Sequence, residues 1–170
     1  MNSSRRLAFL LVVSGLLGPI VAPAQETAPP DKPNFSGRWR MEKDKSNFAG
    51  FHMPDLVVQV VDQRGVTLNV HTVETIGKQT TTNDVSYFTD GTVSNNVING
   101  RQAASKAFWD GKVLNVRTSV KDSDGQQVLV MEDRWDLSDD GKTLTRTSHN
   151  ITPKGSVDMT LTCAKEKVGS

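Results

Sequence analysis

The stretch SKAFWDGKVLNV, residues 105–116, contains two short strand-like segments on either side of a tight turn. Its Asp-Gly pair is a strong hairpin signal, because a two-residue type I′ turn needs a positive φ at both central positions. With Asp110 and Gly111 at those positions, the turn determines which residues of the two strands face each other. The predicted facing pairs are Trp109 with Lys112, Ala107 with Leu114, and Ser105 with Val116.

The two strands of this hairpin share one apolar face, which we expect to point inward. Ala107 and Ser105 lie on that face, where a densely packed core would carry Leu or Ile. The small side chains therefore predict free volume inside the domain. The alternative is that they oppose bulky side chains on the facing strand, as Ala107 opposes Leu114.

Further turn signals follow along the chain at intervals of about ten residues, which is typical of all-β sandwiches and barrels. They lie at residues 63–65, 90–91, 99–100, 124–125, 140–141 and 153–155. No long segment shows helical periodicity. Before residue 90, strands are expected over residues 36–42, 56–62, 66–73 and 78–88.

Each turn also carries the inward face on to the next strand, because side chains alternate between the two faces of a strand. The pairs predicted after the first hairpin are Val120–Leu129, Thr118–Met131, Val116–Asp133, Leu114–Trp135, Leu137–Leu144, Trp135–Arg146, Asp133–Ser148, Ser148–Met159, Arg146–Leu161 and Leu144–Cys163. The pairs predicted before it are Ala103–Asn96, Ser105–Ser94, Ser94–Tyr87 and Asn96–Val85.

This register separates apolar side chains from polar ones along one continuous meander. The apolar inward set is Leu114, Val116, Leu129, Met131, Trp135, Leu137, Leu144, Val157, Met159, Leu161 and Cys163. The apolar residues left on the outward face are Phe88, Val93, Val97, Phe108, Val128 and Val130. A β-bulge or a partner surface would account for such exceptions.

About ten strands, each antiparallel to the next, leave two exposed edges unless the sheet closes on itself. The sequence therefore predicts an all-β fold, a closed antiparallel up-and-down β-barrel of about 8–10 strands. A two-sheet β-sandwich is the alternative.

The first residues have the pattern of an export signal. Arg5 and Arg6 precede an apolar run over residues 7–17 that is too short to span a bilayer, and Ala22-Pro23-Ala24 is a small-residue cleavage site. We expect a signal peptide over residues 1–24, a flexible Pro- and Ala-rich leader over residues 25–34, and the barrel domain over residues 35–168. A periplasmic or secreted protein without a membrane span follows from this division.

The charge balance and the cysteine count of the chain argue against a nucleic-acid partner and exclude an internal disulfide. Without Arg5 and Arg6, the 20 basic residues become 18 against 19 acidic ones, so the net charge falls from +1 to −1. No charge excess directs such a chain to nucleic acid. Cys163 is the single cysteine, so no internal disulfide can form.

The segment Phe35-Ser36-Gly37-Arg38-Trp39 resembles the Gly-x-Trp opening of lipocalins and of intracellular fatty-acid-binding proteins. This resemblance implies a calycin-type β-barrel in which Trp39 closes one end beneath a late-strand cation. Lys165 or Arg146 can supply that cation. The chain departs from fatty-acid-binding proteins in two ways, since residues 43–55 are too short for two lid helices and no Arg-x-Tyr pair follows near the C-terminus.

The chain also resembles a group of small exported bacterial proteins. The shared segments are Ser36-Gly37-Arg38-Trp39, Lys45-Ser46-Asn47-Phe48, Trp109-Asp110-Gly111 and residues 135–144. The resemblance implies a fold and export, and it assigns no activity.

The predicted inward face is unusually polar and small. It includes Ser94, Asn96, Ala103, Ser105, Ala107, Thr118, Asp133, Arg146 and Ser148. In a solid core each unsatisfied polar group would cost about 1–3 kcal/mol. A hydrated cavity removes that cost, and a barrel of this size encloses room for one small ligand.

The candidate ligand-binding residues are Arg146, Tyr87, Trp109, Asp133 and Ser105. Arg146 can bind a carboxylate at one end of an amphipathic molecule. Alternatively, Asp133 neutralises it and Trp135 stacks on it in a structural network. Tyr87 and Trp109 can stack on a ligand, or they are plain core.

Catalytic, metal-binding and cofactor-binding motifs are not predicted. His52, His71 and His149 are scattered along the chain, without the spacing of metal ligands. The chain has no nucleophile elbow or phosphate-binding loop. The Asp-rich segments at residues 122–125 and 139–141 lack the distal Glu of a calcium loop and are read as hairpin turns.

Three functions remain open on the sequence. The first is an exported carrier of a small apolar or amphipathic ligand, held in the barrel cavity. The second is an interaction protein, such as an inhibitor of another exported protein. Its barrel would be packed solid, and the leader over residues 25–34 would extend from the domain to bind the partner. The third is a barrel enzyme. A carrier needs a continuous internal void, and an enzyme needs a titratable cluster inside a pocket.

Overall fold

The computed structural model describes residues 32–167. The predicted signal peptide and residues 25–31 of the predicted leader lie outside the described residues. Lys32, Pro33 and Asn34 fall within the predicted leader and are described. Lys32 donates to the Gly111 carbonyl, at 2.9 Å, and the Gln63 amide donates to the Pro33 carbonyl, at 3.2 Å. No helix among the described residues is long and apolar enough to cross a membrane.

The described chain consists of strands and one short 3₁₀ helix, η1 (Lys43–Lys45). The first four strands are β1 (Gly37–Met41), β2 (Leu56–Arg64), β3 (Thr67–Ile76) and β4 (Gln79–Phe88). The other six are β5 (Ser94–Ile98), β6 (Arg101–Asp110), β7 (Val113–Lys121), β8 (Gln127–Leu137), β9 (Thr143–Thr152) and β10 (Gly155–Lys165). The predicted strands before residue 90 are confirmed to within a few residues at their ends.

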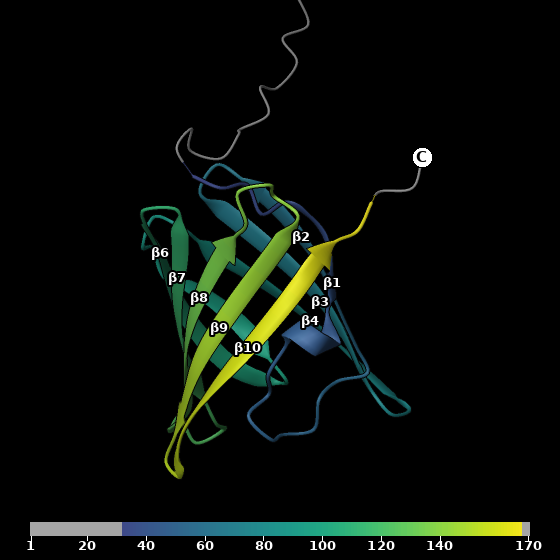
Figure 1. Cartoon of the computed structure of the whole chain (residues 1–170). Helices are drawn as coiled ribbons and strands as arrows, with labels where there is room; N and C mark the ends of the chain where they lie inside the picture. The colour runs from purple at the N-terminus through teal and green to yellow at the C-terminus, as the bar shows by residue number, and fades with distance from the viewer. Residues whose placement is uncertain (1–31, 168–170) are drawn as a thin grey trace, which may run out of the picture.

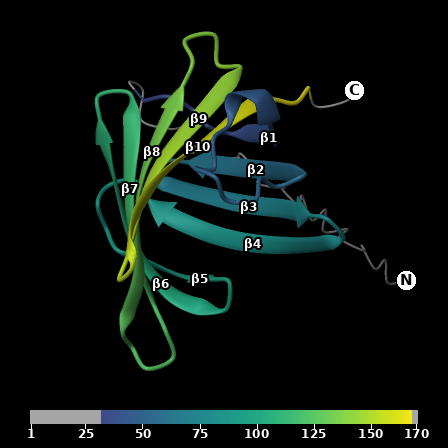
Figure 2. The same cartoon turned by 60° about the horizontal axis from the view of Figure 1, so that its bottom comes forward.

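All ten strands form one antiparallel sheet in the order β4-β3-β2-β1-β10-β9-β8-β7-β6-β5. Pairing of β1 with β10 joins the first strand to the last, and the sheet curls around a common interior (Figures 1 and 2). The predicted up-and-down barrel is therefore confirmed, and the sandwich alternative is set aside because the strands form a single sheet. Only β4 and β5 remain as edges.

The predicted register holds through the second half of the barrel. Val116 faces Asp133, Trp135 faces Arg146, and Leu161 faces Arg146 from the other side, as the turns predict. Val93, Val97 and Phe108 lie exposed on the outer surface, whereas the outward Val130 is buried. The pairing of β7 with β8 has one register shift, between Val120 and Lys121, but it lies next to the turn, and Val120 still faces Leu129 as predicted.

The first hairpin is an exception, and its predicted pairs are wrong by two positions. Trp109 faces Leu114 rather than Lys112, and Asp110 faces Val113. The turn residues are thus Gly111 and Lys112. Gly111 has a φ of 58°, while Asp110 and Lys112 are not in the positive-φ region. This is the pattern of a type II′ turn, in which Gly occupies the first central position. A shift of two residues leaves each side chain on its predicted face.

Trp39 packs in the core of the barrel and is held by the segment that precedes β1. Its ring is fully buried, and its indole Nε1 donates to the Phe35 carbonyl, at 2.8 Å. The Lys165 ammonium lies 5.0 Å from the centre of the ring, so Lys165 and not Arg146 is the cation over Trp39. Gly37 has a φ of 149°, a backbone conformation that other residues rarely adopt, which accounts for the Gly of the Gly-x-Trp segment.

The barrel does not close by backbone pairing between β4 and β5, so the predicted pairs Ser94–Tyr87 and Asn96–Val85 are wrong. The Gly91 N–H donates to the Ala107 carbonyl, at 2.9 Å, which ties the Asp-Gly segment to β6 and prevents a tight turn. The Asn96 side chain bridges the seam instead. It accepts from the Ser86 N–H, at 2.8 Å, and donates to the Ser86 carbonyl, at 3.0 Å.

Asn96→Ala is expected to loosen this seam. The substitution removes both side-chain hydrogen bonds to Ser86, and each contributes about 0.5–1.5 kcal/mol. We expect faster amide hydrogen exchange in β4 and β5 and little change in the other strands. Asn95→Ala is the matched control, because Asn95 is exposed on the outer face of the same strand. Equal exchange in the two variants would show that Asn96 does not hold the seam.

Candidate ligand cavity

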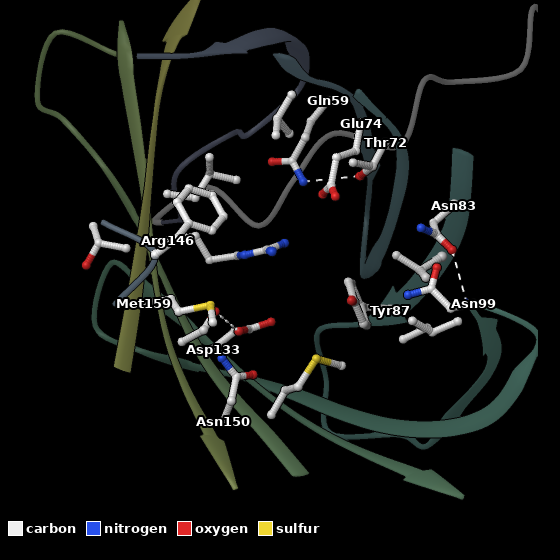
Figure 3. A pocket seen from close by; sticks show the side chains of 18 residues that line it. Gln59, Thr72, Glu74, Asn83, Tyr87, Asn99, Asp133, Arg146, Asn150 and Met159 are labelled. Carbon is white, nitrogen blue, oxygen red and sulfur yellow. Dashed lines mark hydrogen bonds between the residues drawn. The ribbon is translucent and has the colours of Figure 1, made fainter. Parts of the chain in front are cut away.

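A cavity of about 390 Å³ lies inside the barrel, between strands β2–β4 on one side and β8–β10 on the other. Its apolar lining consists of Phe48, Val57, Val85, Tyr87, Ile98, Met131, Met159 and Leu161. Its polar lining consists of Gln59, Thr72, Glu74, Asn83, Asn99, Asp133, Arg146, Ser148, Asn150 and Thr160. Figure 3 shows these side chains pointing into a common space. A lining of this mixed kind suits a ligand with both apolar and polar parts.

Arg146 extends from β9 into the cavity (Figure 3). Its guanidinium carbon lies 5.5 Å from the centre of the Trp135 ring, so the predicted stacking on Trp135 is present. No carboxylate of residues 32–167 lies within ion-pair distance of it, and its buried Nε has no hydrogen-bond partner among them. The alternative in which Asp133 neutralises Arg146 therefore does not describe this arrangement.

Asp133 lines the same cavity from β8 and is 6% exposed. Its carboxylate accepts a short hydrogen bond from the Ser148 hydroxyl on β9. The facing positions of Asp133 and Ser148 on neighbouring strands, which the register predicts, bring the two side chains together. Ser148 thus occupies an oxygen of Asp133 while the guanidinium of Arg146 remains free for another partner.

Two weak acids close to Arg146 are kept neutral by burial. Burial, and next the negative charge of Asp133, raise the pKa of Tyr87 to about 12, against a smaller lowering by Arg146. Burial also raises the pKa of the Cys163 thiol to about 11. Both groups therefore favour the protonated state in the folded protein, which makes Cys163 a poor nucleophile.

Alkaline pH is expected to destabilise the fold through these two groups. Each has a higher pKa folded than unfolded, so its contribution is fully present below the unfolded pKa and is lost as the pH rises through the folded pKa. The window extends from pH 9.0, the ordinary thiol value, to the Tyr87 pKa of about 12. Denaturant midpoints at about pH 8 and about pH 10.5 measure this loss. A double variant, Tyr87→Phe with Cys163→Ala, should lose less stability over this interval; an unchanged loss would contradict the assignment.

Trp109 and Ser105, the other two candidates, do not line this cavity. Trp109 stacks on Phe35, with ring centres 5.6 Å apart and planes 4° apart. The Ser105 hydroxyl lies 2.8 Å from that of Thr118, and both residues are buried. Phe35 thus fills the end of the barrel that Trp109 faces. The small side chains of β6 belong to a packed wall, and the free volume lies beside Tyr87, Asp133 and Arg146.

The sequence did not single out the cavity residues on β2 and β3, of which Gln59, Thr72 and Glu74 are polar. Gln59 shares one face of β2 with the buried Val57 and Val61, and it faces Thr72 on β3. That signal is present in the sequence. It was not used, because the turn was predicted at residues 63–65, whereas Arg64 pairs with Thr67 and the turn consists of residues 65 and 66.

Comparison with known proteins supplies a fold. No protein-family model matches the chain, and no curated protein sequence matches it. Among solved structures, zebrafish ileal bile acid-binding protein complexed with cholic acid is 17% identical, with a TM-score of 0.53, over 78% of this chain and 98% of that one. Fatty-acid-binding protein 1 of Echinococcus granulosus is 19% identical, with a TM-score of 0.54, over 78% and 98%.

A third similar structure is secretory abundant heat soluble protein 4 of Ramazzottius varieornatus. It is 11% identical, with a TM-score of 0.55, over 78% of this chain and 95% of that one. At these identities the likeness concerns the fold alone. The match covers nearly the whole length of each of these three structures, and all three are calycin-type barrels. With its ten-stranded antiparallel sheet, this chain has the calycin-type β-barrel fold.

Proposed function

We propose that this protein is an exported carrier of a small amphipathic acid, held inside the barrel with its carboxylate on Arg146. The observation that supports this most strongly is the unpaired guanidinium of Arg146 in a partly apolar cavity. Arg146 as a residue is only partly buried, but its Nε is a buried donor without a partner among residues 32–167, which is unfavourable in the empty protein. A bound carboxylate would supply the missing partner through two parallel N–H···O bonds.

The apolar part of the ligand would lie against Met131, Met159, Leu161 and Val57. Methionine side chains adapt to irregular ligand shapes, because they are unbranched and polarizable. The cavity volume is about 390 Å³. At about 30 Å³ for each water-sized group, that is room for roughly 13 non-hydrogen atoms. Such a volume suits a medium-chain acid better than a long-chain one that must be wholly enclosed.

The similar structures support a binding role over an enzymatic one. The zebrafish protein is a bile acid-binding protein in complex with cholic acid, and the Echinococcus protein is a fatty-acid-binding protein. The alternative of an inhibitor with a solid barrel is less favoured, because the interior contains a cavity. Export rests on the signal-peptide pattern at residues 1–24, and a periplasmic or secreted location follows from it.

Native mass spectrometry of the protein from its own host's exported fraction tests the carrier directly. A discrete extra mass that is lost on denaturation would support it. Calorimetric titration with decanoate, decanol and palmitate then tests the ligand class. We expect decanoate to bind more tightly than decanol, because decanol lacks the carboxylate. Absence of any bound mass, together with no binding of decanoate, would overturn the proposal.

A further inference from the structure

We infer that the ligand carries an ammonium group at the end remote from its carboxylate, and that Glu74 binds this group. The inference rests on the proposed function and narrows it to a zwitterionic amphiphile. It comes from the charges of the cavity wall. Three charged residues line the cavity, namely Arg146, Asp133 and Glu74. Their sum is one positive and two negative charges, a net charge of −1.

A simple fatty acid would bring a further negative charge into the cavity, so the net charge of the lining residues and the ligand together would be −2. Like charges inside a partly desolvated space repel more strongly than in water. A ligand with one carboxylate and one ammonium leaves the sum at −1 and gives each of its charges a partner of opposite sign. Charge complementarity therefore favours a zwitterion over a plain acid.

Glu74 is the residue placed to receive the ammonium group. It lies on β3, half-buried, and its side chain points into the cavity (Figure 3). Within residues 32–167, no hydrogen bond or ion pair engages its carboxylate, whereas Asp133 is engaged by Ser148. Several carboxylates on the outer surface, by contrast, are paired, as Glu166 is with Arg38 and Arg40.

The surroundings of Glu74 are also polar. Gln59, on the neighbouring strand β2, is 2% exposed and donates from its amide to the Thr72 hydroxyl, at 3.2 Å. Thr72 precedes Glu74 by two positions and shares its face of β3. An ammonium group has three donors and needs several acceptors. The Glu74 carboxylate and the Gln59 carbonyl oxygen offer acceptors on one wall.

The separation of the two charged ends follows from the strand order. Arg146 is on β9 and Glu74 is on β3, with β10, β1 and β2 between them. At about 4.8 Å between neighbouring strands, the two backbones are roughly 19 Å apart along the wall. The side chains then approach each other across the interior. Glu74 and Arg146 thus enter the cavity from different walls, so a ligand that lies between these walls can present one charged group to each.

Binding of ω-aminodecanoate, ω-hydroxydecanoate and decanoate, measured by calorimetric titration, tests the inference. We expect ω-aminodecanoate to bind at least about tenfold more tightly than decanoate, because a charge-assisted hydrogen bond is added. Glu74→Gln should abolish this advantage without weakening the binding of decanoate. Asp136→Asn is the matched control, since it removes one negative charge from the exposed face of β8. It should preserve the advantage.

The outcomes separate this inference from the proposed function. Equal affinities of decanoate and ω-aminodecanoate for the native protein would overturn the assignment of Glu74 and leave the carrier in place. A preference for ω-hydroxydecanoate over ω-aminodecanoate would also overturn it, because Glu74 would then receive a neutral donor. Loss of the advantage in Asp136→Asn as well would show a long-range charge effect rather than a contact. Binding of none of the three acids would count against both proposals.

Discussion

Trp39→Ala is expected to lower the free energy of unfolding by about 3–5 kcal/mol, the range typical of large-to-small substitutions of buried aromatic residues. Trp39 is fully buried and is among the largest side chains of the core. Its removal leaves a cavity in the core. The Phe35 carbonyl also loses its indole donor, and the Lys165 ammonium loses the ring beneath it.

Denaturant unfolding measures this effect, with two further variants that divide it. Trp39→Phe keeps most of the apolar contact and removes the hydrogen bond, so we expect a smaller loss, of about 1–2 kcal/mol. Val60→Ala, on the exposed face of the adjoining strand β2, should cost well under 1 kcal/mol. A cost for Trp39→Ala no larger than that for Val60→Ala would contradict the role of Trp39 in the core.

The second half of the barrel could be predicted from the sequence because its turns are short. Each of these turns transfers the inward face to the next strand, so Asp133, Arg146 and Ser148 were predicted on one face of neighbouring strands. The error at Gly111 moved the pairing by two residues and changed no face. An error of one residue would have reversed every side chain of the strand.

The first half of the site could not be predicted in the same way. The connection from β1 to β2 spans residues 42–55 and includes η1, so no parity passes through it. Glu74 and Gln59 received no predicted face from that side, although the two-residue turns at residues 65–66 and 77–78 carry the inward face of Tyr87 back to them. The interior also contains a packed part and a hollow part, and the strand register alone does not show which residues line each. Phe35, from the segment before β1, fills the end that Trp109 faces, which leaves the free volume beside Tyr87.

The seam between β4 and β5 shows where prediction from a local turn pattern fails. Asp90-Gly91 has the composition of a tight hairpin turn, and a local pattern predicts one. Tertiary contacts decide otherwise, because Thr89 N–H donates to the Val66 carbonyl and Gly91 N–H donates to the Ala107 carbonyl. The chain thus bonds to two different strands in three residues. Asn96 then supplies by its side chain the bonds that backbone pairing would have made.

Arg146→Leu is expected to reduce the affinity for decanoate about thirtyfold or more while leaving the fold intact. Loss of a desolvated, bidentate charge partner typically costs about 2–5 kcal/mol of binding free energy. The free energy of unfolding should change by less than about 1 kcal/mol, because two effects oppose each other. The variant loses the contact of the guanidinium with the Trp135 ring. It also loses a buried Nε donor that has no hydrogen-bond partner among residues 32–167, which is unfavourable in the empty protein.

The two measurements together distinguish a binding residue from a structural one. A structural Arg146 would leave Asp133 as a buried, uncompensated charge on substitution, and stability would fall by about 3–5 kcal/mol. Arg134→Leu is the matched control, because Arg134 lies exposed on the outward face of β8. Its affinity and stability should both match those of the native protein. Arg146→Lys adds a geometric test: it keeps the positive charge and loses the planar fork, so its affinity should lie between those of the native protein and Arg146→Leu. Full affinity in Arg146→Leu would show that the carboxylate is bound elsewhere in the barrel.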